Sequence, residues 1–191
     1  YDIGTMLNDL YNMIAIKAAD KELELEFNID TNIPSEYFGD DIRIKQILMN
    51  LMTNAVKYTH TGKVSLTISA GVKGDEAILH CSVKDTGIGI KKEDIRKLFV
   101  KYQRIEEFRN RDIEGTGLGM NIVVSLLALM GSELKVKSVY GEGSEFYFDI
   151  KQKIINAEPL GDFQKSFHRT ENRVGEIIDY IAPEAKVLVV D

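Results

Sequence analysis

The sequence predicts an α+β fold, in which helices pack on one face of a single mixed or antiparallel sheet. Apolar residues recur with a helical period over residues 2–19 and again in the stretch that ends at Tyr58. Two later pairs of short strand-like runs, each joined by a glycine-containing turn, indicate two β-hairpins. The resulting order of helix, strand, helix, hairpin, helix, helix and hairpin suits a two-layer domain of this class.

Several predicted elements have a local signal at one end. Pro34 and Gly39 mark a loop after the first strand, and Asp40 or Asp41 is placed to cap the helix that follows. Gly131 ends the last helix. In chain order the predictions are a helix over 2–19, a strand over 23–29, a helix over 41–58, strands over 64–70 and 77–85, helices over 92–99 and 120–130, and strands over 133–139 and 144–151.

The composition argues against several classes of function. The net charge of −6 argues against general nucleic-acid binding, which needs a basic face. The single cysteine, Cys81, excludes an internal disulfide and lies in an apolar run typical of a core. The three histidines, His60, His80 and His168, lack metal-ligand spacing. The longest apolar stretch, 122–130, is too short to span a bilayer, so we expect a cytoplasmic domain whose parent protein could be anchored elsewhere.

One edge of the helix that ends at Tyr58 carries an unusual set of polar side chains. Asn50, Asn54, Lys57 and Tyr58 lie at i, i+4, i+7 and i+8, so they project into an arc about 100° wide. Amide oxygens can join the coordination shell of Mg²⁺, and Lys neutralises phosphate charge, so this edge suits a cation–phosphate site. Alternatively, the two Asn only cap the helix or bond a neighbouring loop. The neighbouring face carries an ordinary core stripe of Ile44, Ile47, Leu48, Leu51 and Ala55.

A first glycine motif follows the strand predicted over 77–85. Asp85 ends that strand, and Gly87 and Gly89 let the backbone turn tightly and approach a ligand. A carboxylate in this place can accept a hydrogen bond from an exocyclic amine, a charge-assisted interaction that contributes about 1.5–3 kcal/mol. The alternative is a plain Asp-Thr-Gly turn, which is a common structure.

A second glycine motif, Gly115-Thr116-Gly117-Leu118-Gly119, leads directly into the helix predicted over 120–130. Free backbone N–H groups at the start of a helix suit phosphates. The motif is not the dinucleotide fingerprint, because Met120 and Asn121 follow Gly119 where that spacing requires another glycine, and the chain has no Walker motif. On its own this motif is a weak signal.

Together, the motifs resemble the ATP-binding domain of sensor histidine kinases, within the wider family that includes DNA gyrase, the heat-shock chaperone ATPase and MutL. The resemblance covers about residues 1–152. The N box of that family is matched by Asn50-x-x-x-Asn54-Ala-x-Lys57-Tyr58, and the F box by Leu98-Phe99 through Tyr102. The first G box is matched by Asp85-x-Gly87-x-Gly89 and the second by Gly115 through Gly119. The last G box is matched by Gly141 through Phe146, with Ser144 where Thr is usual.

This resemblance implies a two-layer α/β sandwich of the Bergerat type that binds Mg²⁺ and ATP. Residues 101–114, which are highly charged, would be a mobile lid, in which Arg104 or Arg109 is a weaker candidate to reach the γ-phosphate. The implied catalytic residues are Asn50, which would also hold Mg²⁺, and Lys57. The implied ATP-binding residues are Asn54, Tyr58, Asp85, Gly87, Gly89, Ile90, Phe99, Gly115, Thr116, Gly117, Leu118, Gly119 and Ser144.

The residue at position 50 favours phosphoryl transfer over hydrolysis. Hydrolases of this superfamily usually place a Glu general base four residues before the key Asn, and here that position is Asn50. An amide cannot take a proton near pH 7, whereas transfer to a protein side chain needs only that ATP be positioned and its charge neutralised. Two alternatives stay open: a scaffolding or sensing module that binds ATP without transferring it, and an ATP-driven dimer clamp.

The resemblance also implies partners that the chain does not contain. Residues 1–22 have no His, so the phosphoacceptor is expected on a separate helical dimerisation domain, and the chain is expected to be a monomer that does not phosphorylate itself. The run KVLVVD resembles the first strand of a receiver domain, which would make the parent a hybrid kinase. The expected segments are the end of an upstream helical region over 1–22, the ATP-binding catalytic domain over 23–152, a linker over 153–185 and a truncated receiver strand over 186–191.

Overall fold

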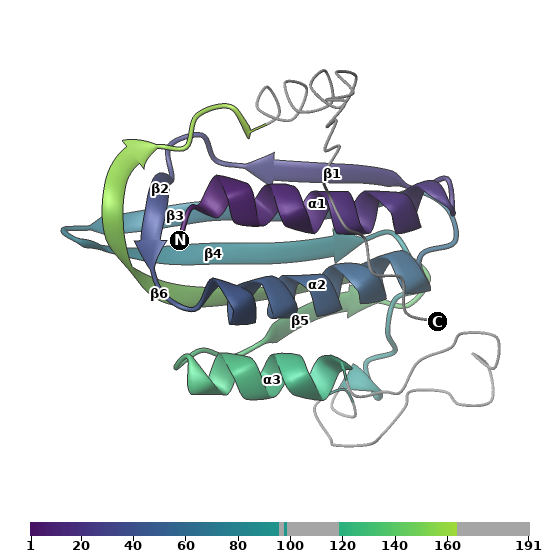
Figure 1. Cartoon of the computed structure of the whole chain (residues 1–191). Helices are drawn as coiled ribbons and strands as arrows, with labels where there is room; N and C mark the ends of the chain where they lie inside the picture. Colours follow the sequence, from purple (N-terminus) through teal and green to yellow (C-terminus); the bar gives the residue numbers. More distant parts are fainter. Residues whose placement is uncertain (96–97, 99–118, 164–191) are drawn as a thin grey trace, which may run out of the picture.

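The computed structural model describes residues 1–95, 98 and 119–163, and these form two layers. Figure 1 shows a curled sheet covered on one face by helices. This arrangement confirms the predicted α+β class with a mixed sheet. The elements are α1 (Ile3–Ala19), β1 (Glu24–Ile29), β2 (Pro34–Phe38), α2 (Asp41–Tyr58), β3 (Lys63–Lys73), β4 (Glu76–Asp85), α3 (Gly119–Leu129), β5 (Lys135–Val139) and β6 (Gly143–Pro159).

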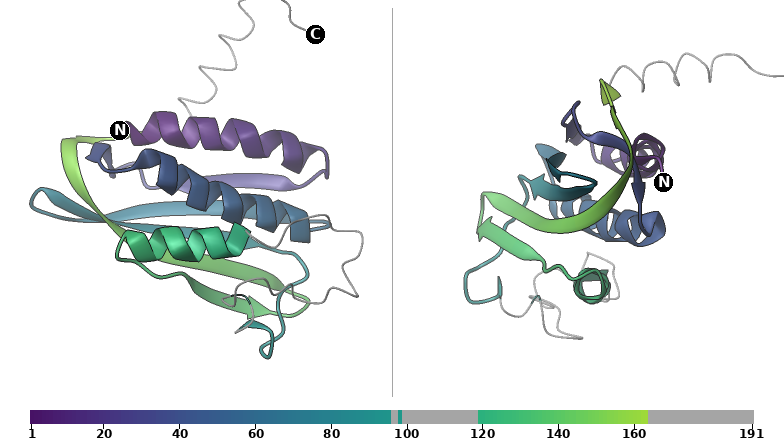
Figure 2. Two further views of the ribbon diagram at one scale, coloured as in Figure 1. Left: turned by 60° about the horizontal axis from the view of Figure 1, so that its bottom comes forward. Right: turned by 90° about the vertical axis from the view of Figure 1, so that its left-hand side faces the viewer.

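The sheet has the strand order β1-β3-β4-β6-β2, and β5 also pairs with β6. Strands β1 and β3 are parallel, whereas the other neighbours are antiparallel. Helices α1, α2 and α3 lie side by side on one face, as both views in Figure 2 show. The register places Asp85, the last residue of β4, opposite Ser144 near the start of β6, and Val139 at the end of β5 opposite Gly143. The end of β4, the end of β5 and the start of β6 therefore meet at one end of the sheet.

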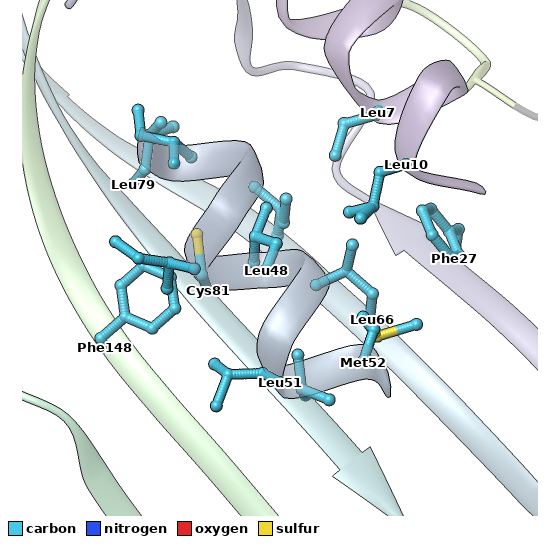
Figure 3. Close-up of a cluster of buried hydrophobic side chains, with 14 of the residues drawn as sticks. Leu7, Leu10, Phe27, Leu48, Leu51, Met52, Leu66, Leu79, Cys81 and Phe148 are labelled. Carbon is cyan, nitrogen blue, oxygen red and sulfur yellow. The ribbon is translucent and has the colours of Figure 1, made fainter. Parts of the chain in front are cut away.

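The core lies between the helices and the sheet, and Figure 3 shows part of it. The stripe predicted on α2 is buried, together with Met52 and Val56. Cys81 also lies in the core, 2% exposed, as predicted. Burial raises the pKa of its thiol to about 12, so the side chain acts as a small apolar group. Among the described residues, no helix is both long and apolar enough to cross a membrane.

Two details of the fold differ from the sequence predictions. Residues 34–38 form strand β2, not a loop, and pair with the last part of β6. Helix α1, which belongs to the segment expected to be the end of an upstream helical region, buries its apolar stripe in the same core as α2 and the sheet. Strand β6 continues to Pro159, which places residues 153–159 in the sheet and not in a linker. Beyond the strand, Phe163 is buried and stacks on Phe27. Residues 164–185 of the predicted linker and the predicted receiver strand lie outside the described residues.

Candidate functional site

The helix with the polar edge, α2, begins as predicted. Asp40 is its N-cap, and the Asp40 carboxylate accepts a hydrogen bond from the backbone N–H of Arg43 at 3.1 Å. The strands and helices that surround α2 cover its apolar stripe, and the neighbouring polar edge remains only partly covered. Asn50, Asn54, Lys57 and Tyr58 are all half-buried there. The ammonium of Lys57 lies 5.1 Å from the centre of the Tyr58 ring, a cation–π distance.

Asn50 connects α2 to the start of α3. Its amide Nδ2 donates to the carbonyl of Gln46 at 2.9 Å, a bond within α2 that is neither a helix cap nor a contact with a neighbouring loop. That bond uses only the amide nitrogen. The amide oxygen faces Gly119, the first residue of α3, where an added Cβ would lie 2.9 Å from Oδ1. The structure therefore brings together Asn50 and Gly119, two predicted site residues that are 69 positions apart.

Asp85 is a buried carboxylate at the end of β4, 5% exposed. Its Oδ1 accepts a hydrogen bond from the backbone N–H of Gly87 at 2.8 Å. Burial raises the pKa of Asp85, and backbone hydrogen bonds from Gly87 and Ser144 partly oppose this effect. A buried carboxylate is stable only when donors surround it, so this group suits a ligand that supplies another N–H.

The first glycine loop packs its backbone directly against two other segments. A Cβ at Gly87 would overlap the carbonyl oxygen of Tyr58, and a Cβ at Gly89, which has φ +65°, would overlap that of Val139. Two hydrogen bonds hold the same contacts: Ile88 N–H donates to Tyr58 O at 3.2 Å, and Gly141 N–H donates to Ile88 O at 2.8 Å. Glycine is required because a side chain would separate the loop from the end of α2 and from the β5–β6 turn.

Ser138 links three parts of this region, and sequence reasoning missed it. Its hydroxyl accepts from Ile90 N–H at 2.7 Å and donates to Gly143 O at 2.9 Å. It also bonds the Ser144 hydroxyl at 3.0 Å, and Ser144 is 7% exposed. A single Ser in an alternating strand gives no signal of this kind. The network holds Ile90 and Ser144, both predicted site residues, against one another.

The described site residues gather at one end of the two layers, where β4 ends and α3 begins (Figure 1). Asn50 lies against Gly119 and Tyr58 against Gly87, and Ile90 is linked to Ser144 through Ser138. Asn54 lies one turn from both Asn50 and Lys57 on the same edge of α2. The predicted residues Phe99, Gly115, Thr116, Gly117 and Leu118, and the predicted lid over 101–114, lie outside the described residues and stay predictions.

Comparison with known proteins identifies this arrangement. Residues 39–154 match the family "Histidine kinase-, DNA gyrase B-, and HSP90-like ATPase". The chain is 36% identical to hybrid signal transduction histidine kinase B of Dictyostelium discoideum, over 82% of this chain and 8% of that protein. It is 31% identical to the signal transduction histidine-protein kinase BarA of Escherichia coli, over 97% of this chain and 20% of that protein.

Solved structures show the same fold. Full-length ShkA in complex with AMPPNP has a TM-score of 0.70 and 30% identity, with 82% of this chain and 31% of that chain covered. The mycobacterial sensor histidine kinase MprB has a TM-score of 0.60 at 18% identity, with 81% of this chain and 97% of that chain covered, which shows the fold alone. This chain spans only 8% and 20% of the two curated relatives named above. The family match covers more than half of the chain, and the chain therefore belongs to the histidine kinase-, DNA gyrase B- and HSP90-like ATPases.

Proposed function

We propose that this chain is the catalytic domain of a hybrid sensor histidine kinase, which positions Mg·ATP for transfer of the γ-phosphoryl group to a histidine on a separate helical domain. The observation that carries the proposal is the buried carboxylate of Asp85 beside a glycine loop that touches the end of α2. The relatives named as histidine kinases support the class of reaction.

Asp85 would select the adenine base. Its carboxylate already accepts backbone hydrogen bonds from Gly87 and Ser144, and it would accept a further one from the adenine amine. In a buried site such a charge-assisted bond contributes about 1.5–3 kcal/mol. Gly87 and Gly89 would shape the wall of the base pocket, because neither has a side chain and both are fixed by backbone contacts. Ile90 and Ser144 would complete that wall through the Ser138 network.

The edge of α2 would hold the triphosphate. Lys57 would neutralise phosphate charge, with Asn54 and Tyr58 beside it, and Gly119 would present backbone to the phosphates together with Gly115, Thr116, Gly117 and Leu118. Phe99 would line the pocket.

The residues present at this edge also fit Mg²⁺. The cradle in front of Asn50 Oδ1, which a Cβ at position 119 would fill, presents a neutral oxygen ligand of the kind that Mg²⁺ accepts beside substrate phosphates. When bound, the ion would neutralise charge on the transferring phosphoryl group. Asn50 would hold it, and Lys57 would supply a second positive charge.

The proposal extends to partners and location. The acceptor histidine would lie on a helical dimerisation domain of the parent protein, and residues 186–191 would be the first strand of a receiver domain. Since ATP is the phosphoryl donor, the domain would work in the cytoplasm. The isolated chain would be monomeric, because the dimer contacts would belong to the acceptor helices.

The direct test measures binding and transfer separately. Calorimetry of the chain with Mg·ATP should show saturable binding. With γ-labelled ATP, label should move to an added helical hairpin that bears the acceptor histidine of a homologous hybrid kinase, and not to the chain alone. Binding without transfer to any hairpin would favour the scaffolding alternative. Label on the chain itself would contradict the proposal that the acceptor histidine lies on a separate domain.

Asn50→Ala should reduce transfer by about 100-fold, because one preorganised group that stabilises developing charge is lost. The variant should also lose most of the dependence of ATP affinity on Mg²⁺, which titration with and without a chelator would reveal. Thr53→Ala, on the same helix and half-buried, is the matched control and should behave like the wild type. An unchanged Mg²⁺ dependence in Asn50→Ala would remove Asn50 from the metal site.

A further inference from the structure

The last turn of a helix leaves backbone carbonyls without the usual partner in the helix, and in α2 each carbonyl of residues 55–59 has another partner. Ala55 O accepts from the N–H and the hydroxyl of Thr59, at 3.1 and 2.7 Å. Tyr58 O accepts from Ile88 N–H in the first glycine loop. The other three carbonyls, those of Val56, Lys57 and Thr59, accept from a single ammonium, Lys21 Nζ, at 2.9, 2.9 and 3.3 Å. All three donors of that ammonium are therefore used.

Lys21 comes from a different part of the chain, the turn between α1 and β1. Glu22 has φ +56°, a left-handed conformation that reverses the chain after α1, and Leu23 N–H returns to Ala18 O at 3.0 Å. Glu24 N–H then donates to Gly62 O at 3.0 Å, just beyond the end of α2. This turn places the Lys21 ammonium at the negative end of the α2 dipole, where a cation is favourable.

The carbonyls that Lys21 binds belong to the end of α2, the segment that contacts the first glycine loop through Tyr58. Val56 is 3% exposed and Thr59 is fully buried, and the hydrogen bonds from the exposed Lys21 to their carbonyls are partly buried, whereas the bond to Lys57 is exposed. Lys57 carries its side chain to the phosphate edge, and Tyr58 O is the contact with Ile88. If the three carbonyls lost their donor, the backbone angles of this segment could change. The Lys57 side chain and the hydrogen bond from Ile88 to Tyr58 would then both move.

We propose that Lys21 is a positioning residue for the nucleotide site: by clamping the carbonyls of Val56, Lys57 and Thr59, its ammonium sets the orientation of Lys57 and Tyr58 and the register of the glycine loop. The proposal rests on the proposed function of the site. It assigns no contact between Lys21 and ATP, and it predicts that a residue outside the sequence motifs controls affinity for the phosphates.

The experiment compares Lys21→Met with Lys21→Arg and with the control Lys17→Met. Lys17 is exposed on α1, and its replacement removes the same charge. Lys21→Met should weaken Mg·ATP binding about 10-fold, as measured by calorimetry. Lys21→Arg keeps the charge and the hydrogen-bond donors, so it should recover at least half of that loss on a logarithmic scale. Lys17→Met should bind Mg·ATP like the wild type. Adenosine, which lacks phosphates but would contact the glycine loop, should also bind more weakly to Lys21→Met, by a smaller factor than ATP.

Amide exchange in the nucleotide-free chain supplies a readout that does not depend on ATP. In Lys21→Met the amides of Thr59 and Ile88 should exchange at least 10-fold faster, while that of Leu79, in the middle of β4, should keep its rate. Uniform acceleration of all three amides, or an unchanged ATP affinity in a folded Lys21→Met, would overturn the proposal. If that variant does not fold, Lys21→Arg decides: a folded Arg variant that binds ATP more than 10-fold more weakly than the wild type would overturn it. A wild-type chain that binds no ATP would refute the proposed function instead.

Discussion

Asp85→Asn is expected to weaken ATP binding by roughly 10- to 150-fold, which corresponds to the loss of a charge-assisted hydrogen bond of about 1.5–3 kcal/mol. The Asn carbonyl oxygen can keep the hydrogen bond from Gly87 N–H. The amide nitrogen then occupies the place of Oδ2, so that a donor faces the adenine amine, which is also a donor. The fold should persist, because the replacement has the same shape.

Calorimetric titration with ATP and with GTP measures this effect. GTP presents a carbonyl where adenine has its amine, so the variant should lose much of its preference for ATP over GTP. Asp75→Asn is the matched control, because Asp75 is an exposed carboxylate at the β3–β4 turn, at the other end of the strand that Asp85 ends. Equal ATP affinity in Asp85→Asn and the wild type would show that this carboxylate does not bind the base.

The same substitution, which should weaken ATP binding, should raise the stability of the nucleotide-free chain at neutral pH. Burial raises the pKa of Asp85 in the folded chain above its value in the unfolded chain. The contribution of such a group to stability is complete below the unfolded pKa, near 3.9, and is lost as the pH rises through the folded value. The Asn variant cannot ionise and is spared this loss, so nucleotide-free Asp85→Asn should gain stability relative to the wild type as the pH rises.

Urea unfolding at about pH 3.5 and pH 7 tests the sign. The free energy of unfolding of the variant minus that of the wild type should be larger at pH 7, since the other titrating groups are common to both chains and cancel. A difference that becomes smaller with pH would mean that the hydrogen bonds from Gly87 and Ser144 outweigh the effect of burial on the carboxylate. Together with the affinity loss, the predicted result describes a residue kept for binding at a cost to stability.

The sequence predicted the elements that carry the strongest periodic signals. Helix α2 was recognised with its cap and core stripe because a long amphipathic segment, a capping Asp and a clear end coincide there. Strand β2 was missed because it is short, begins at Pro34 and lies at the edge of the sheet, where proline is tolerated. The packing of α1 against the common core could not be predicted, because an apolar stripe does not say which surface will cover it.

The sequence predicted the motif residues of the candidate site, but it did not predict the residues that support them. Asp85, Gly87 and Gly89 stand in a pattern whose spacing has a chemical reason. Lys21 and Ser138 act through backbone groups that are distant in sequence, so their residue types gave no signal. The extension of β6 was missed for a similar reason: residues 153–159 mix apolar and polar side chains without a clean alternation and end at a proline, and only their pairing with β2 reveals the strand.

Gly89→Ala is expected to destabilise the chain by about 3 kcal/mol or more, while Gly74→Ala should cost only about 1 kcal/mol. Both glycines have φ +65°, so the penalty for placing an alanine in a left-handed conformation is the same. They differ in their surroundings. A Cβ at Gly74 would have no heavy atom within 4 Å, whereas at Gly89 it would overlap Val139 O and lie 2.7 Å from the carbonyl carbon.

The difference between the two variants therefore isolates the steric term. At Gly89 the obstacle is backbone, which cannot rotate away as a side chain would, so the β5–β6 turn must move. That movement would break the hydrogen bonds from Gly141 N–H to Ile88 O and from Ile90 N–H to Ser138. Gly89→Ala should consequently also weaken ATP binding, and Gly74→Ala should not. Denaturant unfolding and calorimetry of both variants measure the two effects, and equal losses of stability would show that the turn yields freely and does not hold the glycine loop in place.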